Sequence, residues 1–255
     1  MRILALDMDD TLLQSDGTIS NRTLKALDQW QTQGNRIVIA TGRPHRSIAP
    51  SLPEPLLPLP RICYNGAEIR HNDERIYADF IPDEQVGEVT TFIQTQYPGI
   101  NVGVEVEDDH YCLYPRGGRL RISYQVVERL DNLGKPAAKI LMWPENETDL
   151  QPLIDWLPPT VGTFITPKFQ LVQIQSGTAD KSTALKALVE GWGYSLADVV
   201  AMGDDVNDTE MLRVSGFGVA VENALPEVKA AANRVTVSND EDAVAVIVEE
   251  LLGIQ

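Results

Sequence analysis

Acidic residues follow two apolar runs of the sequence. Asp7 and Asp9 come after the run ILAL, and Asp204 and Asp208 come after the run VVAM. Residues i and i+2 of an extended segment point the same way, so we expect the carboxylates of Asp7 and Asp9 to converge on one spot beyond the edge of a sheet. Like charges at that spacing need a counterion.

A metal ion is the counterion that these residue types favour. If the strand before Asp204 neighbours the strand before Asp7, the two groups of acids form an all-oxygen site. Such a site suits Mg²⁺ with retained waters rather than zinc or copper. Acids at strand ends also cap the helices that follow them, and the sequence alone leaves that alternative open.

The acids need a scaffold that brings strand ends together, and the first forty residues predict one. Residues 2–7 and 36–41 are apolar runs, typical of parallel strands that are buried on both faces. Between them, residues 21–33 repeat apolar side chains at helical spacing, with Ser20 as the N-cap. A strand, a helix and a strand predict a right-handed crossover in a doubly wound, Rossmann-like parallel sheet, where ligands bind beyond the carboxyl ends of the strands.

The alternation of strands and helices stops and later resumes, which predicts two domains. We expect an α/β core of residues 1–82 and 177–255, with an inserted α+β domain at 83–176 in which strands pair through short turns. Within the insert the pattern predicts helices at 83–96, 119–131 and 146–157 and strands at 101–106, 111–115, 138–143, 161–166 and 169–175.

The remaining core elements follow the same alternation. A segment with five prolines, residues 50–60, is typical of a linker, but the apolar run at 61–65 would complete the same sheet, so we expect this segment to loop back within the core. A hairpin is expected at 67–80. After the insert we expect helices at 181–192, 206–213, 225–231 and from 240, and strands at 198–204, 217–221 and 234–237.

Composition limits the classes of partner. The chain has 255 residues, with 21 Lys and Arg against 37 Asp and Glu, and this formal net charge of −16 disfavours binding to nucleic acid or to anionic membranes. A bound cation would reverse the local field, so the acidity does not exclude phosphorylated substrates. Cys63 and Cys112 lack metal-binding spacing, and no apolar run suits a signal peptide or a membrane span, so we expect a cytoplasmic protein.

Four groups of residues, in order along the chain, resemble the motifs of the haloacid dehalogenase superfamily. They are Asp7-x-Asp9-x-Thr11-Leu12, Thr41-Gly42-Arg43, Lys181, and Gly203-Asp204-Asp205-Val206-Asn207-Asp208. The position and content of the insert resemble the type IIB cap of the Cof-like subfamily, and residues 64–68 and 181–185 also look like that group. The resemblance implies a Mg²⁺-dependent phosphatase, which is a phosphoric monoester hydrolase.

The resemblance also implies a role for each acid. Asp7 would attack the phosphoryl group and form an aspartyl-phosphate that water then hydrolyses. Asp9 would protonate the leaving alcohol and later take a proton from the attacking water. Mg²⁺ would be held by the carboxylates of Asp7 and Asp204 and by the backbone carbonyl of Asp9, with Asp208 as a further ligand or as a partner of a ligand.

Charge on the transferred phosphoryl oxygens needs hydrogen-bond donors as well. The resemblance assigns this to the hydroxyl of Thr41, to backbone N–H groups at Gly42 and to the ammonium of Lys181. Asn207 would be a donor near the phosphate or near Lys181. Arg43 belongs to the second motif, and both a substrate contact and a structural role stay open for it.

The insert holds a short basic run, Arg116, Arg119 and Arg121, in an otherwise acidic region. One hypothesis is that Arg116 or Arg119 reaches a second anionic group of the substrate. The alternative is a solvated start of a helix.

The expected function is hydrolysis of a small phosphorylated metabolite, with sugar phosphates as the default because of the resemblance, by a monomer or a small homo-oligomer. A phosphomutase of the same superfamily is one alternative. The other is a non-enzymatic signalling module, since receiver domains also combine acids, a Thr and a Lys on a doubly wound sheet. Receivers phosphorylate an Asp after a central strand, whereas the paired acids here follow the first.

Overall fold

The computed structural model describes residues 2–72, 74–114, 123–145, 148–166 and 170–254. The chain forms two compact units, one of residues Met1–Tyr77 and Asp180–Gln255 and the other of residues Ala78–Ala179. The expected boundaries at 82/83 and 176/177 lie within a few residues of this division.

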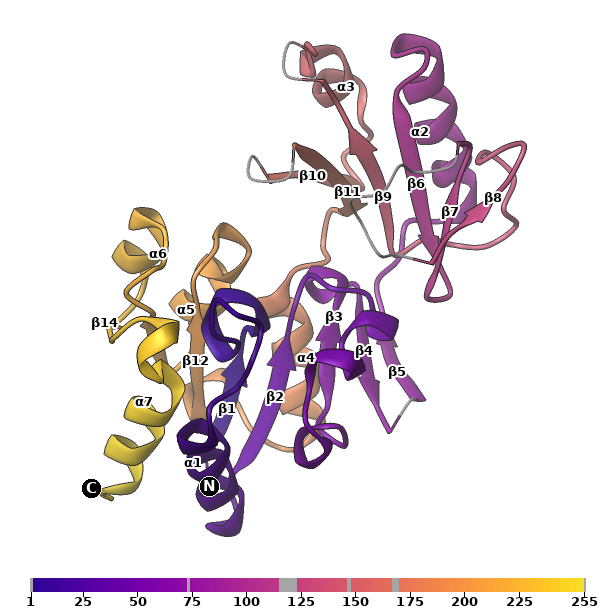
Figure 1. The fold of residues 1–255 in the computed structure, drawn as a ribbon. Coiled ribbons are helices and arrows are strands. Elements are labelled where there is room, and N and C mark those ends of the chain that lie inside the picture. The colour runs from indigo at the N-terminus through magenta and orange to yellow at the C-terminus, as the bar shows by residue number, and fades with distance from the viewer. Residues whose placement is uncertain (1, 73, 115–122, 146–147, 167–169, 255) are drawn as a thin grey trace. The chain divides into compact units, whose positions relative to one another are not determined.

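An eight-stranded sheet forms the centre of the first unit (Figure 1). Its strand order is β14-β13-β12-β1-β2-β3-β4-β5. The strands are β1 (Ile3–Leu6), β2 (Arg36–Ala40), β3 (Arg61–Cys63), β4 (Glu68–His71), β5 (Glu74–Ala78), β12 (Val199–Gly203), β13 (Phe217–Ala220) and β14 (Arg234–Val235). The pairs from β14 to β3 are parallel, and β4 is antiparallel to β3. This confirms the doubly wound α/β core.

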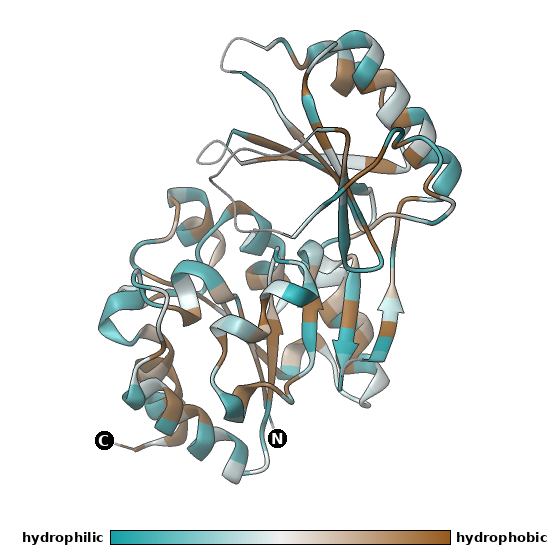
Figure 2. Cartoon of the chain, turned by 45° about the vertical axis from the view of Figure 1, so that its right-hand side comes forward, coloured by the Kyte–Doolittle hydropathy of each residue, from teal (hydrophilic) through white to brown (hydrophobic). Residues whose placement is uncertain are grey.

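Helices cover both faces of this sheet (Figure 1). They are α1 (Asn21–Thr32), α4 (Lys181–Gly191), α5 (Thr209–Val214), α6 (Pro226–Ala231) and α7 (Ala243–Leu252). Helices α1 and α7 lie side by side, and Arg22 of α1 donates to Glu249 of α7 over 2.6 and 3.0 Å. Central strands β1 and β12 are buried along their whole length, so their apolar runs (brown in Figure 2) fill the core between the helical layers.

The proline-rich segment stays within the first unit, as expected. It forms short 3₁₀ turns at Ala49–Ser51 and Glu54–Leu56 and then enters β3, which pairs in parallel with β2. The expected hairpin corresponds to β4 and β5. Since proline disfavours the helical conformation of the residue before it, the segment makes single turns and no long helix.

A six-stranded sheet forms the second unit, in the order β10-β11-β9-β6-β7-β8. The strands are β6 (Asn101–Val106), β7 (Asp109–Cys112), β8 (Gln125–Val126), β9 (Lys139–Trp143), β10 (Val161–Thr166) and β11 (Leu171–Ser176). Helices α2 (Asp83–Gln96) and α3 (Gln151–Trp156) pack on one face, where a cluster of buried apolar side chains that includes Val89, Val104 and Leu153 forms the core. The unit is α+β, as its strand pairs predicted.

The predicted helix at 119–131 is wrong over its described part. Residues 123–131 contain no helix, and Gln125–Val126 form β8 in parallel with β7. The neighbouring β-branched residues Val126 and Val127 lose rotamer freedom in a helix, and the free edge of β7 offers them backbone hydrogen bonds, such as that from Val127 N to Cys112 O at 2.9 Å.

Helix α3 begins later than the predicted 146–157, of which residues 146 and 147 lie outside the described part of the chain. Pro152 stands in its first turn, where the missing N–H costs nothing. The predicted helix at 206–213 is a 3₁₀ turn at Val206–Asp208 followed by α5.

Candidate active site

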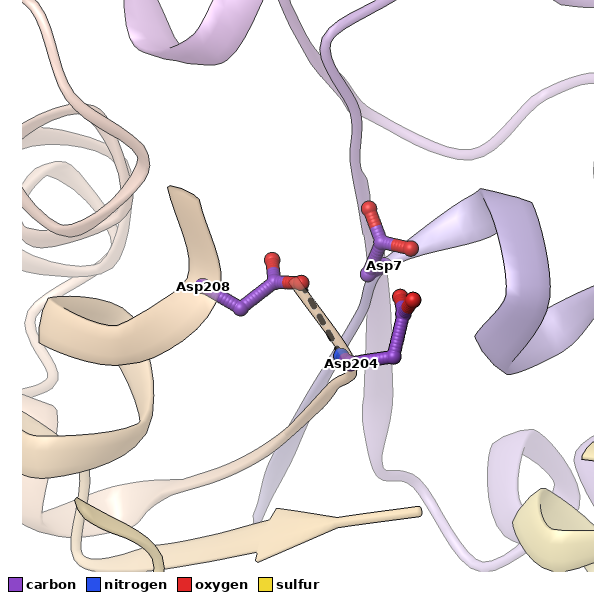
Figure 3. Close-up of side chains that lie close together, drawn as sticks. All are labelled: Asp7, Asp204 and Asp208. Carbon is purple, nitrogen blue, oxygen red and sulfur yellow. Dashed lines mark hydrogen bonds between the residues drawn. The ribbon is translucent and has the colours of Figure 1, made fainter. Parts of the chain in front are cut away.

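The acidic cluster lies where two neighbouring strands end. β1 pairs in parallel with β12, with Leu6 opposite Met202, and Asp7 N donates to Met202 O over 2.9 Å. The two carboxyl ends therefore meet, which is the condition that the all-oxygen site required. Carboxylate oxygens of Asp7, Asp204 and Asp208 lie within 4.8 Å of one another (Figure 3). This cluster is the only group of three or more His, Cys, Asp or Glu with metal-binding geometry in the part of the chain that the structure describes.

Lys181 inserts a positive charge into this cluster. It is the first residue of α4, and Asp180 caps the helix by accepting from Ser182 N and Thr183 N over 2.7 and 2.9 Å. The side chain of Lys181 is buried, and its Nζ donates to Asp7 Oδ1 at 2.6 Å and to Asp208 Oδ1 at 2.7 Å. The ammonium thus restrains the carboxylate of Asp7.

Burial and mutual repulsion oppose ionisation of the acids. Burial raises the pKa of Asp7 well above its usual value, Asp208 raises it further, and Lys181 acts against both. Burial and then Asp208 raise the pKa of Asp204 to about 7. For Lys181, burial lowers the pKa, but the nearby Asp208 and Asp7 outweigh it and the net shift is upward. One ammonium does not balance the charge of three ionised carboxylates, so a divalent cation would be attracted to the cluster.

Asp208 is buried and holds the backbone of the loop that follows β12. Its side chain is fully buried, and its Oδ2 accepts from the backbone N–H groups of Asp204 and Asp205 over 3.1 and 3.2 Å, the first of which is the dashed line in Figure 3. A Cβ on Gly203 would lie 2.4 Å from Asp208 Cγ, so only glycine fits there. Both oxygens of Asp208 therefore accept hydrogen bonds, one from Lys181 and the other from the loop after β12.

Asp9 lies outside this cluster. Its side chain is 51% exposed, and its two oxygens accept from Arg43 Nε at 2.8 Å and from Arg43 Nη2 at 2.5 Å. The expected convergence of the carboxylates of Asp7 and Asp9 therefore does not hold in this structure. The cause is local: β1 ends at Leu6 and the chain turns over Met8–Leu12, so Asp7 and Asp9 are not residues i and i+2 of one continuing strand. Met8, between them, is fully buried.

The second motif lies at the end of β2, which neighbours β1. Thr41 N donates to Ile62 O at 2.9 Å, and the hydroxyl of Thr41 accepts from Arg43 N at 3.1 Å. A Cβ on Gly42 would lie 2.6 Å from Asn65 Oδ1, so the glycine allows a close approach that another residue would block. Arg43 reaches Asp9 and Ser51, and so joins two loops of the core.

Asn65 is a residue of the site to which the sequence analysis gave no role. Its Oδ1 accepts from Asn207 Nδ2 at 3.0 Å, and its N donates to Thr41 O at 3.1 Å. It thus connects the second motif with the fourth. Asn207, expected as a donor near the phosphate or near Lys181, donates to Asn65 in this structure. Asn207 Oδ1 is buried without a partner among the described residues.

The signal for Asn65 was present in the sequence as Asn-Gly after the third strand, a pair typical of a turn. Asn65 (φ 56°) and Gly66 (φ 103°) both lie in the left-handed region. A Cβ on Gly66 would lie 2.1 Å from Asp180 O, so this glycine lets the start of α4 approach and helps to place Lys181. The turn therefore serves the site as well as the chain reversal.

The three arginines of the insert, Arg116, Arg119 and Arg121, lie outside the described residues. Their roles stay predictions.

The fold and the acidic cluster together are those of a haloacid dehalogenase-type hydrolase, and comparison with known proteins agrees. A family model described as haloacid dehalogenase-like hydrolase matches residues 4–248. The chain therefore belongs to this family.

Two curated relatives are named phosphatases. A 5-amino-6-(5-phospho-D-ribitylamino)uracil phosphatase of Bacillus subtilis, YitU, is 29% identical, with 99% of this chain and 98% of the relative covered. A pyridoxal phosphate phosphatase of Escherichia coli, YbhA, is 28% identical, with 96% of each covered. The chain is accordingly a phosphoric monoester hydrolase of the haloacid dehalogenase superfamily.

Solved structures share the whole fold. SMU.1108c from Streptococcus mutans superposes with a TM-score of 0.86 at 26% identity, over 99% of both chains. A subclass IIB sugar phosphatase of the superfamily superposes with a TM-score of 0.82 at 24% identity, over 100% of both chains, and shows the same fold. Among the described residues, no helix has the length and apolar character needed to cross a membrane.

Proposed function

We propose that this protein hydrolyses the phosphate monoester of a small metabolite with Asp7 as nucleophile. The observation that carries the proposal is the position of Asp7 at the end of β1, where its carboxylate is held by the ammonium of Lys181 beside two further carboxylates. A positioned, desolvated carboxylate can attack phosphorus and form an aspartyl-phosphate, which divides hydrolysis into two easier steps.

The donor set fits Mg²⁺. Carboxylates of Asp7 and Asp204 and the backbone carbonyl of Asp9 would hold the ion, and Asp208 would keep Lys181 and the loop in place. Oxygen ligands with excess negative charge suit Mg²⁺. When bound, the ion would neutralise charge on the phosphoryl oxygens and on the acids around it.

The remaining residues supply donors and protons. The hydroxyl of Thr41 and the backbone N–H of Gly42 would donate to phosphoryl oxygens, together with Lys181. Asp9 would protonate the leaving alcohol and then accept the proton of the attacking water. Both carboxylate oxygens of Asp9 accept from Arg43 in this structure, so this proton transfer requires the pair of Arg43 and Asp9 to open when substrate enters.

The substrate we propose is a small phosphorylated metabolite. The names of the two relatives specify a phosphorylated ribitylaminouracil and pyridoxal phosphate, and both are small organic phosphates. Sugar phosphates are the class to test first beside these two. We also propose that the inserted domain at 83–176 selects the leaving group. The cytoplasmic location, the absence of nucleic-acid partners and the oligomeric state stay predictions.

Product analysis separates hydrolysis from phosphoryl transfer between positions of one sugar. With a panel of hexose, pentose and cofactor phosphates in Mg²⁺, we expect stoichiometric release of inorganic phosphate and the dephosphorylated alcohol. A phosphorus NMR time course measures both products. A hexose phosphate that isomerises without release of inorganic phosphate would overturn the hydrolase assignment in favour of a mutase.

Mg²⁺ should raise the melting temperature of the protein, because it binds the folded cluster and relieves the repulsion there. Asp204→Asn should lose most of this shift. Asp205→Asn is a matched control: it changes the same charge one residue away, and Asn keeps the cap on Val206 N, which Asp205 now makes at 2.8 Å. Differential scanning calorimetry with and without Mg²⁺ measures the shifts, and equal shifts in both variants would contradict the assignment of Asp204 as a ligand.

A further inference from the structure

A pocket of about 460 Å³ lies in the first unit, beside β3 and β4 and under the connection between β2 and β3. It shares no residue with the acidic cluster. Four basic residues line it, His45, Arg46, Arg61 and Arg70. None of its described lining residues is acidic. In a chain with a formal net charge of −16, this concentration of basic groups points to an anionic ligand.

Arg61 is the buried member of this group. The residue is 5% exposed, and one terminal nitrogen of its guanidinium donates to the backbone carbonyl of Leu57. Its Nε is buried without a partner, and no carboxylate pairs with Arg61 among the described residues. A guanidinium does not deprotonate in proteins, so its burial costs free energy unless an anion compensates the charge.

Strand register adds a second like charge. Arg61 lies directly opposite Arg70 in the antiparallel pair of β3 and β4, and like charges directly opposite destabilise a sheet. Glu68 compensates Arg70 at 2.6 Å, but it also binds Arg75 at 2.8 Å and is itself buried. Because that carboxylate already serves two other arginines, the charge of Arg61 stays uncompensated.

We propose that this pocket binds a small organic molecule through a phosphate-type oxyanion. Guanidinium groups match the oxygens of such an anion, and Arg61 and Arg70 would share it. Leu57 and Leu59 line the same pocket and offer apolar surface to the carbon part of the ligand. The volume falls in the range of small-molecule sites, about 300 to 1,000 Å³, and is larger than a bare phosphate requires.

The test is thermal melting of the full chain with chelator present. Without a divalent ion, the carboxylates of the acidic cluster repel anions, so a response reports the basic pocket. Inorganic phosphate and ribose 5-phosphate are the probes, and sodium chloride and sodium acetate at matched ionic strength are the controls. We expect both phosphates, or ribose 5-phosphate alone, to raise the melting temperature more than the controls do. The first result identifies the oxyanion as sufficient, and the second shows that the organic part is needed.

Variants of the two strand arginines connect the response to the pocket. Arg61→Met and Arg70→Met should each weaken phosphate binding by roughly tenfold or more, the loss of one charge-assisted contact. Without phosphate, Arg61→Met should melt no lower than the wild type, because it removes an uncompensated buried charge. Arg36→Met is the matched control: Arg36 is the first residue of β2, as Arg61 is of β3, but it stacks on Trp192 at 4.5 Å outside the pocket.

Three outcomes would overturn the proposal. One is a wild-type protein that responds to neither phosphate beyond the chloride control. Another is an unchanged phosphate response in both Arg61→Met and Arg70→Met. The third is an acetate response as large as that of the phosphates, which would assign the pocket to carboxylates. None of these outcomes depends on catalysis, so failure of this proposal would leave the proposed hydrolase function untouched.

Discussion

Asp7→Asn should abolish Mg²⁺-dependent hydrolysis of any phosphate monoester that the wild type accepts. The amide is nearly isosteric and can still accept from Lys181 Nζ, but it cannot attack phosphorus. Loss of a nucleophile that acts in concert with its neighbours costs roughly four to six orders of magnitude in kcat. Release of inorganic phosphate from an aryl phosphate, followed in single-turnover and steady-state assays, measures the loss.

The same variant should fold at least as well as the wild type. The pKa of Asp7 is raised in the folded protein, which means that folding disfavours its charged form at neutral pH, and a neutral amide removes that cost. Asp10→Asn is the matched control, because it removes the same charge three residues away and asparagine tolerates the left-handed conformation found there. It should keep most of the activity. Turnover by Asp7→Asn near the wild-type rate would contradict the role of Asp7 as nucleophile.

The position of the acidic cluster could be predicted from sequence because it depends on regular structure. Apolar runs identify β1 and β12 as buried parallel strands, and parallel strands place their carboxyl ends on one edge. That β12 is the neighbour of β1 came from the structure, and it is this pairing that brings Asp204 to Asp7. The helix start that holds Lys181 follows from the same regularity, since Asp180 is a strong N-cap.

Contacts made by irregular backbone could not be predicted in this way. The pair of Asp9 and Arg43 forms in the turn Met8–Leu12, where the sequence analysis expected Asp7 and Asp9 to share an extended segment. The bond between Asn65 and Asn207 joins residues 142 positions apart through two turns. Such contacts follow from where loops pack, and a periodic pattern carries no information about that.

The sequence pattern also does not predict which side chains the loops bury. Arg61 reads as a polar residue at the start of a strand, a place where arginine is ordinarily exposed. In the structure the residues between β2 and β3 cover it, and its uncompensated charge becomes apparent only then. The predicted helix at 119–131 failed for a related reason, because the edge of β7 decided the conformation of Gln125–Val126.

Lys181→Met should cost both activity and stability. Methionine has a similar length and suits a buried position, but it leaves the carboxylates of Asp7 and Asp208 without their shared ammonium. Removing one partner of a buried ion pair destabilises a protein by about 3–5 kcal/mol, and removing a preorganised donor of this kind lowers kcat by roughly 10²–10³-fold. Urea unfolding with chelator and steady-state kinetics with Mg²⁺ measure the two effects.

The two effects of Lys181→Met should separate when Mg²⁺ is added. A divalent ion in the cluster compensates part of the negative charge that the ammonium no longer balances, so it should restore stability. It should restore kcat less, because the ammonium is also a donor to the phosphoryl group in the proposed mechanism. Lys186→Met is the control, since Lys186 lies on the same helix, is 59% exposed and should change neither quantity much. If Mg²⁺ restored kcat fully in Lys181→Met, the lysine would act only by balancing charge, and its assignment as a donor to the phosphoryl group would be wrong.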